Sequence, residues 1–409
     1  MKVLYLSYDG LLDPLGRSQI LPYIEGIQEG LGVSFYLLTF EKEERWQKEG
    51  RAMREYLKDR RISWYPLSFT QRPPLIAKAY DSFRFYWSAR RIVQREEISL
   101  LHARSYVAGW VAHRISSQRG IPWIFDMRGF WADERRETGA WPAHNPFFDW
   151  LYKIWKKRER HMLGSAAHVV VLTEAARQEL ETWGVPSSKI TVIPCVADFE
   201  LFRPRGEGRR LYRNQLGIPE EAFVLGYVGS IGALYEVRDM LRFFERLLRQ
   251  RPDSFFVFFT PADPTLVSSF IQEVRLPAER IKTQYLPHTE VPKGIEALDA
   301  SVIFYRPGFS RKGCSPVKIS ELLAMNVPVV TQADLGDQLV LSQKLKGLYL
   351  VKDFSSHAYD EVIIRLLQDL RRQPVQQVRE WARPHLALEV GIEQYEKVYR
   401  QLQQLHRTN

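Results

Sequence analysis

Residues 313–330 read Gly-Cys-Ser-Pro-Val-Lys-Ile-Ser-Glu-Leu-Leu-Ala-Met-Asn-Val-Pro-Val-Val and predict a short helix that leads into a buried strand. Ser315 is a suitable N-cap, and Pro316 suits the first helical position. Asn326 can end the helix in the left-handed conformation, and Pro328 prevents the helix from continuing. A helix followed at once by an apolar run is typical of the alternation found in parallel sheets.

The same alternation of short apolar strands with helices extends outward over the whole chain. Strands are expected at 3–7, 34–39, 99–102, 123–126, 168–172 and 190–194, and again at 223–228, 255–260, 283–286, 300–305, 327–331 and 347–351. A polar stretch at 203–208 separates the two series. The sequence therefore predicts an α/β protein with two doubly wound domains, 1–205 and 206–385, followed by an amphipathic helix at 386–409.

The composition excludes several classes of protein. The chain has 409 residues, 45% of them apolar and 26% charged, which is incompatible with a disordered chain. No apolar run approaches the roughly 18 residues of a spanning helix, and no secretion signal is apparent. The two cysteines, Cys195 and Cys314, are too few for a disulfide framework or a four-thiolate metal site. A cytoplasmic location and no metal site are therefore expected.

Positive charge is concentrated in one segment of the chain. Residues 51–95 hold 11 Lys and Arg against 3 Asp and Glu, a net charge of +8 out of the total of +10. Aromatic residues interleave with these charges, which suits an anionic surface such as a membrane leaflet or a lipid-linked phosphate. The alternative is a solvated helical face whose aromatic side chains point into the core. No nucleic-acid-binding motif accompanies the charge, so a nucleic-acid partner is not expected.

The helix that begins at Pro316 should lie at the carboxyl edge of its sheet, where helix N-termini attract phosphate. Lys318 stands in the first turn, which is unfavourable for a cation unless an anion binds there. The alternative is an ordinary ion pair between Lys318 and Glu321 at a spacing of three residues.

The segment 315–330 resembles the donor-binding segment of glycosyltransferase family 4, whose members are retaining enzymes of GT-B fold. Further agreement lies at 8–10 and 13–19, 125–134, 192–194, 202–204 and 226–232. The resemblance implies two Rossmann-like domains facing across a cleft, with the acceptor side in 1–205 and the nucleotide-sugar donor side in 206–385. It also implies that the helix at 386–409 crosses back to the first domain and that no metal cofactor is needed.

The resemblance also implies a set of donor-binding residues. Glu321 matches the glutamate that binds the ribose of the sugar nucleotide, whereas Gly313 stands where relatives carry a second glutamate that contacts the donor sugar. Relatives often place Arg and Lys where this chain has 229–236, which contains neither. The expected donor residues are Gly16, Arg17, Gly229, Ser230, His288, Arg311, Lys312, Ser315, Lys318 and Glu321. Arg17 has the alternative of being an ordinary exposed loop residue.

On the acceptor side, Asp126 and Arg128 stand where many relatives carry a histidine, and His102 ends a neighbouring strand. We predict these three as catalytic residues, with a structural histidine and a salt bridge as the alternatives. Arg104, Asp133, Glu134 and Thr173 are expected near the acceptor.

The predicted activity is transfer of a sugar from a nucleoside-diphosphate sugar to a hydroxyl group with retention, in polysaccharide biosynthesis on a lipid-linked or cell-surface glycan. The segment 51–95 is the candidate contact with the inner face of a membrane. The alternative is a GT-B protein that binds a nucleotide sugar without transferring it, such as a 2-epimerase or a non-catalytic partner subunit, because the glutamate expected at Gly313 is missing.

Overall fold

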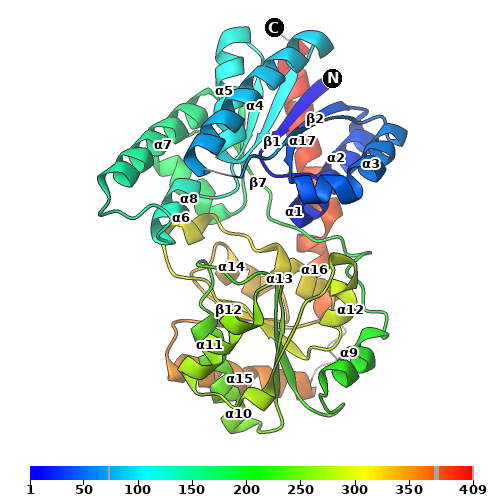
Figure 1. The fold of residues 1–409 in the computed structure, drawn as a ribbon, viewed down its shortest axis with the longest axis vertical. Helices are drawn as coiled ribbons and strands as arrows, with labels where there is room; N and C mark the ends of the chain where they lie inside the picture. Colours follow the sequence, from blue (N-terminus) through cyan, green and yellow to red (C-terminus); the bar gives the residue numbers. More distant parts are fainter. Residues whose placement is uncertain (72–73, 373–376, 408–409) are drawn as a thin grey trace. The chain divides into compact units, whose positions relative to one another are not determined.

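The computed structural model describes residues 1–71, 74–372 and 377–407, and the chain forms two compact units (Figure 1). Unit 1 comprises Met1–Pro194 and Leu388–Asn409, and unit 2 comprises Cys195–Ala387.

The chain passes into unit 2 at Cys195, before the predicted boundary at 205. Hydrogen bonds explain the difference, because the Cys195 N–H donates to Ser315 Oγ (3.1 Å) and its carbonyl accepts from Ser320 Oγ (2.9 Å). The Arg379 guanidinium donates to the carbonyls of Phe199 and Phe202 at 2.5 and 2.6 Å. The segment that follows Pro194 is therefore tied to unit 2 by side chains that the local sequence does not reveal.

In the described part of unit 1, seven parallel strands form a sheet of order β3-β2-β1-β4-β5-β6-β7. They are β1 (Lys2–Ser7), β2 (Ser34–Glu41), β3 (Ser63–Ser68), β4 (Leu100–Arg104), β5 (Trp123–Asp126), β6 (His168–Val171) and β7 (Ile190–Val192). The edge strand β3 was not expected, because it lies in the basic segment and contains Pro66, which donates no backbone hydrogen bond.

Helices cover both faces of this sheet (Figure 1). They are α1 (Pro14–Gln19), α2 (Leu21–Leu31), α3 (Glu43–Asp59), α4 (Pro74–Glu96), α5 (Ser105–Arg119), α6 (Trp131–Glu137), α7 (Pro146–Ser165), α8 (Glu174–Thr182) and α17 (Leu388–Arg407). The helix α17 packs against α2. Gly26 and Gly30 permit this close approach, because a Cβ atom at either position would lie within 2.5 Å of Ile392 or Glu396.

In the described part of unit 2, six parallel strands form a sheet of order β10-β9-β8-β11-β12-β13. They are β8 (Val224–Val228), β9 (Phe255–Phe259), β10 (Ile281–Gln284), β11 (Ala300–Val302), β12 (Val329–Gln332) and β13 (Leu348–Val351). The helices are α9 (Gly208–Leu216), α10 (Val237–Gln250), α11 (Pro264–Val274), α12 (Val291–Ile295), α13 (Val317–Ala324), α14 (Gln338–Lys344), α15 (Ser356–Arg372) and α16 (Gln377–Leu386). Both units thus have the predicted Rossmann-like architecture.

The segment 313–330 forms α13 and β12, and Asn326 adopts the expected left-handed conformation with φ of 60°. The predicted cap at Ser315 is wrong, because Pro316 is the N-cap and the Ser315 hydroxyl accepts from Cys195 instead. Among the residues that the structure describes, no helix combines the length and the apolar character needed to cross a membrane.

Candidate functional site

In unit 2, the loop after β8 meets the start of α13. The Gly229 N–H donates to the Phe259 carbonyl (2.9 Å) at the end of β9, with φ of 125°. A Cβ atom at this position would lie 2.7 Å from Lys318 Nζ, so only glycine suits both the backbone and the neighbour. The predicted donor residues Gly229, Ser230 and Lys318 thus lie together at the carboxyl edge of the sheet, where α/β proteins bind ligands.

Lys318 is held among tyrosine side chains. Its Nζ donates to the Tyr227 hydroxyl (3.0 Å) and lies 4.7 and 4.2 Å from the ring centroids of Tyr227 and Tyr235. The Tyr227 hydroxyl in turn donates to the Ser230 carbonyl (2.6 Å). Cation–π and hydrogen-bonding contacts therefore fix a positive charge beside the loop after β8.

The two tyrosines are contacts of the candidate site that the sequence did not reveal. Lys318 contacts Tyr227 across 91 residues of sequence, and no local pattern marks a contact of that kind. The ring of Tyr235 packs against that of Tyr305 at a tilt of 53°, with ring centroids 4.8 Å apart, and a β-bridge joins the two residues. Arg306 forms an ion pair with Glu236 (3.2 Å), the residue that follows Tyr235.

Glu321 lies one helical turn after Lys318 on α13. Burial raises the pKa of its carboxyl to about 7, and the positive charge of Lys318 opposes part of this shift. Among the described residues, its side chain has no hydrogen-bond or ion-pair partner. The predicted ion pair between Lys318 and Glu321 is therefore not formed, and the carboxyl is available to accept hydrogen bonds from a ligand.

The other expected donor residues of unit 2 lie in different surroundings. Arg311 is buried and donates to Ser310 Oγ (2.5 Å), whereas Lys312 is exposed and lies 5.2 Å from the Phe309 ring. Ser315 is used in the bond to Cys195. His288 begins a 3₁₀ turn (His288–Glu290) after β10.

In unit 1, adjacent strands bring the predicted catalytic residues together. Arg104 at the end of β4 pairs in register with Asp126 at the end of β5. Asp126 lies 3.6 Å from Arg104 and 3.3 Å from Arg128, between nitrogen and oxygen, and 3.7 Å from His102 Nε2. Asp126, His102 and Arg104 are all buried.

The charges of this cluster act on one another. Burial alone would raise the pKa of Asp126, but Arg128, His102 and Arg104 outweigh it and hold the pKa well below its usual value. Burial lowers the pKa of His102, against the opposing effect of Asp126. Asp126 is therefore ionised and His102 neutral at pH 7.

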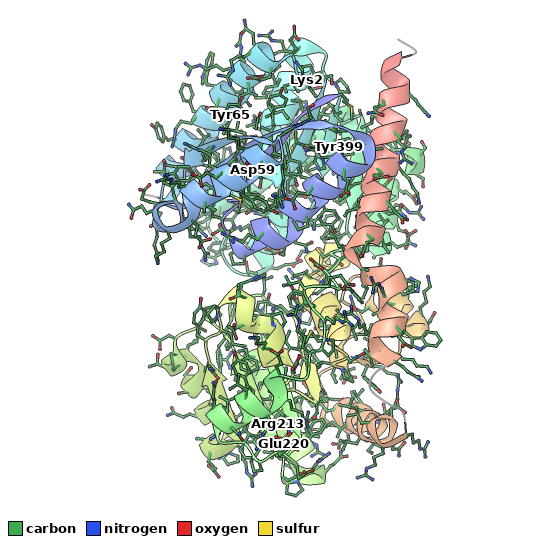
Figure 2. The ribbon with its side chains drawn as sticks, turned by 90° about the vertical axis from the view of Figure 1, so that its right-hand side faces the viewer. Lys2, Asp59, Tyr65, Arg213, Glu220 and Tyr399 are labelled. Atoms are coloured by element: carbon green, nitrogen blue, oxygen red, sulfur yellow. The ribbon has the colours of Figure 1, made fainter. Side chains whose placement is uncertain are left out.

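The helix α17 completes the surroundings of His102. The Tyr399 hydroxyl lies 2.7 Å from His102 Nδ1, and the rings of Tyr5 and Tyr395 pack against the imidazole (Figure 2 labels Tyr399). His102 Nε2, Arg104 Nε and Asp126 Oδ2 nevertheless have no hydrogen-bond partner among the described residues. Buried polar atoms left in this state indicate a site that a water molecule or a ligand completes.

The loop after β1 is attached to the next strand and helix. Glu41 accepts from the N–H groups of Leu11 and Leu12 at 2.8 and 3.0 Å. Gly16 lies buried in α1. Arg17, expected near a phosphate, forms an ion pair with Glu49 of α3 instead. This ion pair favours the alternative that Arg17 is an ordinary loop residue.

Three expected acceptor residues lie outside the Asp126 cluster. Asp133 on α6 accepts from Tyr152 (2.7 Å) and Lys156 (2.8 Å) of α7, so it joins two helices. Glu134 follows it on α6. The Thr173 hydroxyl accepts from the Ala176 N–H (3.1 Å) as the N-cap of α8. Capping and helix packing account for Asp133 and Thr173.

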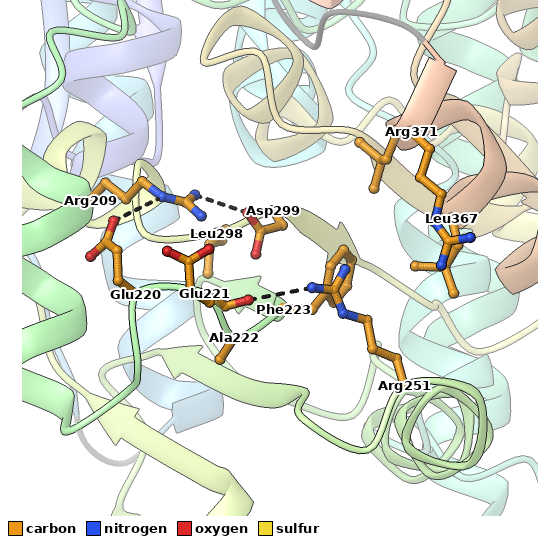
Figure 3. Close-up of a pocket in the computed structure, with 11 residues that line it drawn as sticks. Arg209, Glu220, Glu221, Ala222, Phe223, Arg251, Leu298, Asp299, Leu367 and Arg371 are labelled. Atoms are coloured by element: carbon orange, nitrogen blue, oxygen red, sulfur yellow. Dashed lines mark hydrogen bonds and ion pairs between the residues drawn. The ribbon is translucent and has the colours of Figure 1, made fainter.

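A pocket of about 410 Å³ lies at the opposite, amino edge of the sheet of unit 2 (Figure 3). Three arginines and three carboxylates line it: Arg209, Arg251, Arg371, Glu220, Glu221 and Asp299. Arg209 pairs with Asp299 (2.9 Å) and Glu220 (3.4 Å). Because its charges neutralise one another and it contains none of the expected site residues, we do not assign this pocket to the donor. Within 1–71, 74–372 and 377–407, no cluster of three or more His, Cys, Asp or Glu side chains is arranged to hold a metal ion.

Comparison with known proteins finds similarity to glycosyltransferases. Residues 24–196 match the model of a family described as "Glycosyl transferase 4-like domain". A D-inositol 3-phosphate glycosyltransferase of Kineococcus radiotolerans is 35% identical over 154 residues, which cover 37% of this chain and 34% of that protein. D-inositol 3-phosphate glycosyltransferase 1 of Catenulispora acidiphila is 24% identical over 292 residues, covering 68% and 65%. The chain thus spans less than two thirds of the length of either relative.

Two solved structures share the fold. Sucrose-phosphate synthase from Thermosynechococcus elongatus superimposes with a TM-score of 0.71 at 16% identity, over 98% of this chain and 99% of that one. Anabaena HepE in complex with UDP and glucose gives a TM-score of 0.70 at 14% identity, over 98% and 99%. The fold is therefore the predicted GT-B type, and the match of residues 24–196 to a glycosyl transferase 4-like model confirms the resemblance of the chain to glycosyltransferase family 4.

Proposed function

We propose that the protein transfers a sugar from a nucleoside-diphosphate sugar to a hydroxyl group, with retention of configuration. One observation carries the proposal: at the carboxyl edge of unit 2, a lysine fixed by two tyrosines stands one helical turn from a half-buried glutamate that has no partner among the described residues. A fixed cation suits a diphosphate, and a hydrogen-bond-accepting carboxyl suits the two hydroxyls of a ribose.

The proposed reaction needs no metal and no protein nucleophile. The acceptor oxygen bonds to the anomeric carbon while the bond from that carbon to the diphosphate oxygen breaks. The acceptor proton passes to the leaving phosphate on the same face. Lys318 and the N–H groups at the start of α13 stabilise the charge that develops on the leaving oxygen. Backbone amides of 313–315 other than the Cys314 N–H, which already donates to the Arg311 carbonyl (3.0 Å), replace the missing glutamate as the contact to the donor sugar.

For the acceptor, we propose a molecule with an anionic group, such as the phosphate of a lipid-linked or cell-surface glycan. Arg104 and Arg128 stand beside Asp126 at the ends of β4 and β5, and Arg104 also lies 3.8 Å from Asp9, so an anionic group would meet two guanidinium groups as hydrogen-bond donors. The two curated relatives are named for a phosphate-bearing acceptor, D-inositol 3-phosphate. We place the protein in the cytoplasm at the inner face of a membrane, in polysaccharide biosynthesis.

Calorimetry with UDP, GDP, ADP and their sugar conjugates, in the presence of a chelator, tests the donor site. We expect one nucleotide to bind to the wild type and to lose affinity in Glu321→Ala, while Glu279→Ala, which alters an exposed acidic residue before β10 at the amino edge of unit 2, binds normally. If no nucleotide binds, the proposed donor site is wrong. Proton NMR of the product made from the bound sugar nucleotide then reports whether the anomeric configuration is retained.

Gly313 favours a second function. Without the glutamate that contacts the donor sugar in relatives, the protein would bind a nucleotide sugar and either epimerise it at C2 or serve as a non-catalytic subunit. Incubating the protein with the bound nucleotide sugar alone separates these outcomes, since an epimerase changes the sugar without any acceptor, whereas a transferase requires one.

A further inference from the structure

A groove of about 390 Å³ lies in unit 1, away from the Asp126 cluster. It follows the outer edge of strand β3 and is bounded by α3 on one side and α4 on the other (Figure 2 labels Tyr65 of β3). Its volume is in the range of about 300–1,000 Å³ that pockets for small ligands occupy. The lining residues are Leu38, Arg54, Trp64, Tyr65, Pro66, Leu67, Ser88, Arg91, Ile92 and Arg95.

The groove has positive charge that its lining does not neutralise. Three arginines and no carboxylate line it, whereas the pocket of unit 2 balances three arginines with three carboxylates. Arg54 lies 5.1 Å from the Trp46 ring, and neither Arg54 nor Arg91 forms an ion pair with any described carboxylate. Arg95 shares its charge with Glu96 (2.6 Å). The groove therefore favours an anion.

The rest of the lining is apolar and continues onto an exposed stripe. Trp64, Leu67 and Ile92 form the apolar surface beside the arginines. Along α4, the side chains of Tyr80, Phe83 and Trp87 are 54%, 62% and 41% exposed, and positions 80, 83, 87 and 91 follow helical spacing into the groove. Phe85, by contrast, is fully buried. The alternative of aromatic side chains that point into the core therefore holds for Phe85 but not for Tyr80, Phe83 and Trp87.

An added peptide strand does not suit this sheet edge. Pro66, in the middle of β3, has no N–H to donate outward. The Ser68 carbonyl already accepts from the Arg84 guanidinium (3.0 Å). An occupant must therefore use the arginines and the apolar surface rather than the backbone of β3.

We propose that this groove binds an anionic phospholipid of a membrane leaflet. The lipid phosphate lies between Arg54, Arg91 and Arg95, and the adjoining glycerol and acyl carbons contact Trp64, Leu67 and Ile92. The stripe of Tyr80, Phe83 and Trp87 enters the interface beside it, where aromatic side chains are favoured. The proposal goes beyond the transfer reaction, since it assigns a lipid site to a groove with no residue of either candidate site.

The test measures sedimentation of the full chain with vesicles of phosphatidylcholine, with and without phosphatidylglycerol. We expect binding only to the anionic vesicles. Arg54→Glu with Arg91→Glu should weaken that binding at least about tenfold, since each basic residue near an anionic leaflet contributes about 1 kcal/mol. The matched control is Arg119→Glu with Lys157→Glu, which changes two exposed residues of unit 1 by the same charge and should bind nearly as the wild type does.

An equal loss of vesicle binding in both double variants would indicate diffuse electrostatic attraction and would overturn the proposed lipid site. Unchanged vesicle binding of the Arg54 and Arg91 variant would also overturn it. Displacement by glycerol 3-phosphate at the concentration of the lipid would indicate a soluble phosphate ligand and would also overturn it. Calorimetric measurement of nucleotide binding to the same variants reports separately on the donor site. If the double variant unfolds in a thermal scan, Arg91→Gln alone carries the test.

Discussion

Asp126 in unit 1 and Glu321 in unit 2 are both carboxyl groups withdrawn from solvent near a cation, yet their pKa values move in opposite directions. Asp126 has two arginines and a histidine within 4 Å and stays ionised. Glu321 has only Lys318, which is engaged by tyrosines, and its pKa rises to about 7. Burial of a carboxyl group therefore does not determine its charge, and the number of cations that remain available to it does.

The largest expected effect is on the stability of unit 1. Asp126→Asn removes the buried carboxylate that Arg104 and Arg128 share and should lower the free energy of unfolding by about 3–5 kcal/mol. Urea unfolding measures this change, with Glu44→Gln as a control, since Glu44 pairs with Lys48 on an exposed helix face and its loss should leave the unfolding midpoint nearly unchanged. An unchanged unfolding midpoint would mean that the two arginines do not depend on Asp126.

The next effect is on nucleotide affinity. Lys318→Met removes the cation beside the loop after β8 and should weaken nucleotide binding by roughly tenfold to a hundredfold, since a hydrogen bond to a charged group contributes about 1.5–3 kcal/mol. Lys346→Met is the matched control, because Lys346 also lies over an aromatic ring (Trp381, 5.0 Å) but outside the site. Equal affinity of wild type and Lys318→Met in calorimetry would remove Lys318 from the donor site.

A smaller effect is the pH dependence of that affinity. With a pKa of about 7, the Glu321 carboxyl is mostly protonated at pH 6 and mostly ionised at pH 8. If the ionised form accepts the ribose hydroxyls, the dissociation constant should fall as pH rises, by up to about tenfold over this range. Glu321→Gln should lack this component, and identical pH profiles of the two proteins would contradict the assignment.

The smallest effect is on the stability of unit 2. The folded state holds the Glu321 proton more tightly than the unfolded state, so this group contributes stability at low pH that is lost as pH rises from the unfolded value of about 4.5 towards 7. Asp126, with its depressed pKa, behaves in the opposite way. Glu321→Gln lacks this titration, so it should be about as stable as the wild type at pH 4 and about 1 kcal/mol more stable than the wild type at pH 8. A variant that is clearly destabilised at pH 8 would show that Glu321 is ionised and paired.

Much of this arrangement follows from sequence, because strand order and strand ends obey general rules. Arg104 and Asp126 end neighbouring parallel strands, so their meeting at one edge was predictable. The strand β3 was not, because Pro66 weakens its pattern.

Interaction partners that are distant in sequence also limited the prediction of the site. Glu49 neutralises Arg17, Lys156 binds Asp133, and two tyrosines hold Lys318. The residues next to Arg17, Asp133 or Lys318 in the sequence do not indicate these partners. The candidate residues could therefore be predicted from the sequence, but the contacts that they make in the fold could not.

The packing of α17 against α2 also has a consequence for synthesis. His102 receives Tyr399 only after residues 388–407 have been made, although most of unit 1 leaves the ribosome before unit 2 does. At about 5–20 residues per second, the exposed surface of α2 waits some tens of seconds for its covering helix. We expect nascent chains stopped before residue 388 to be cleaved by protease within unit 1 while unit 2 resists.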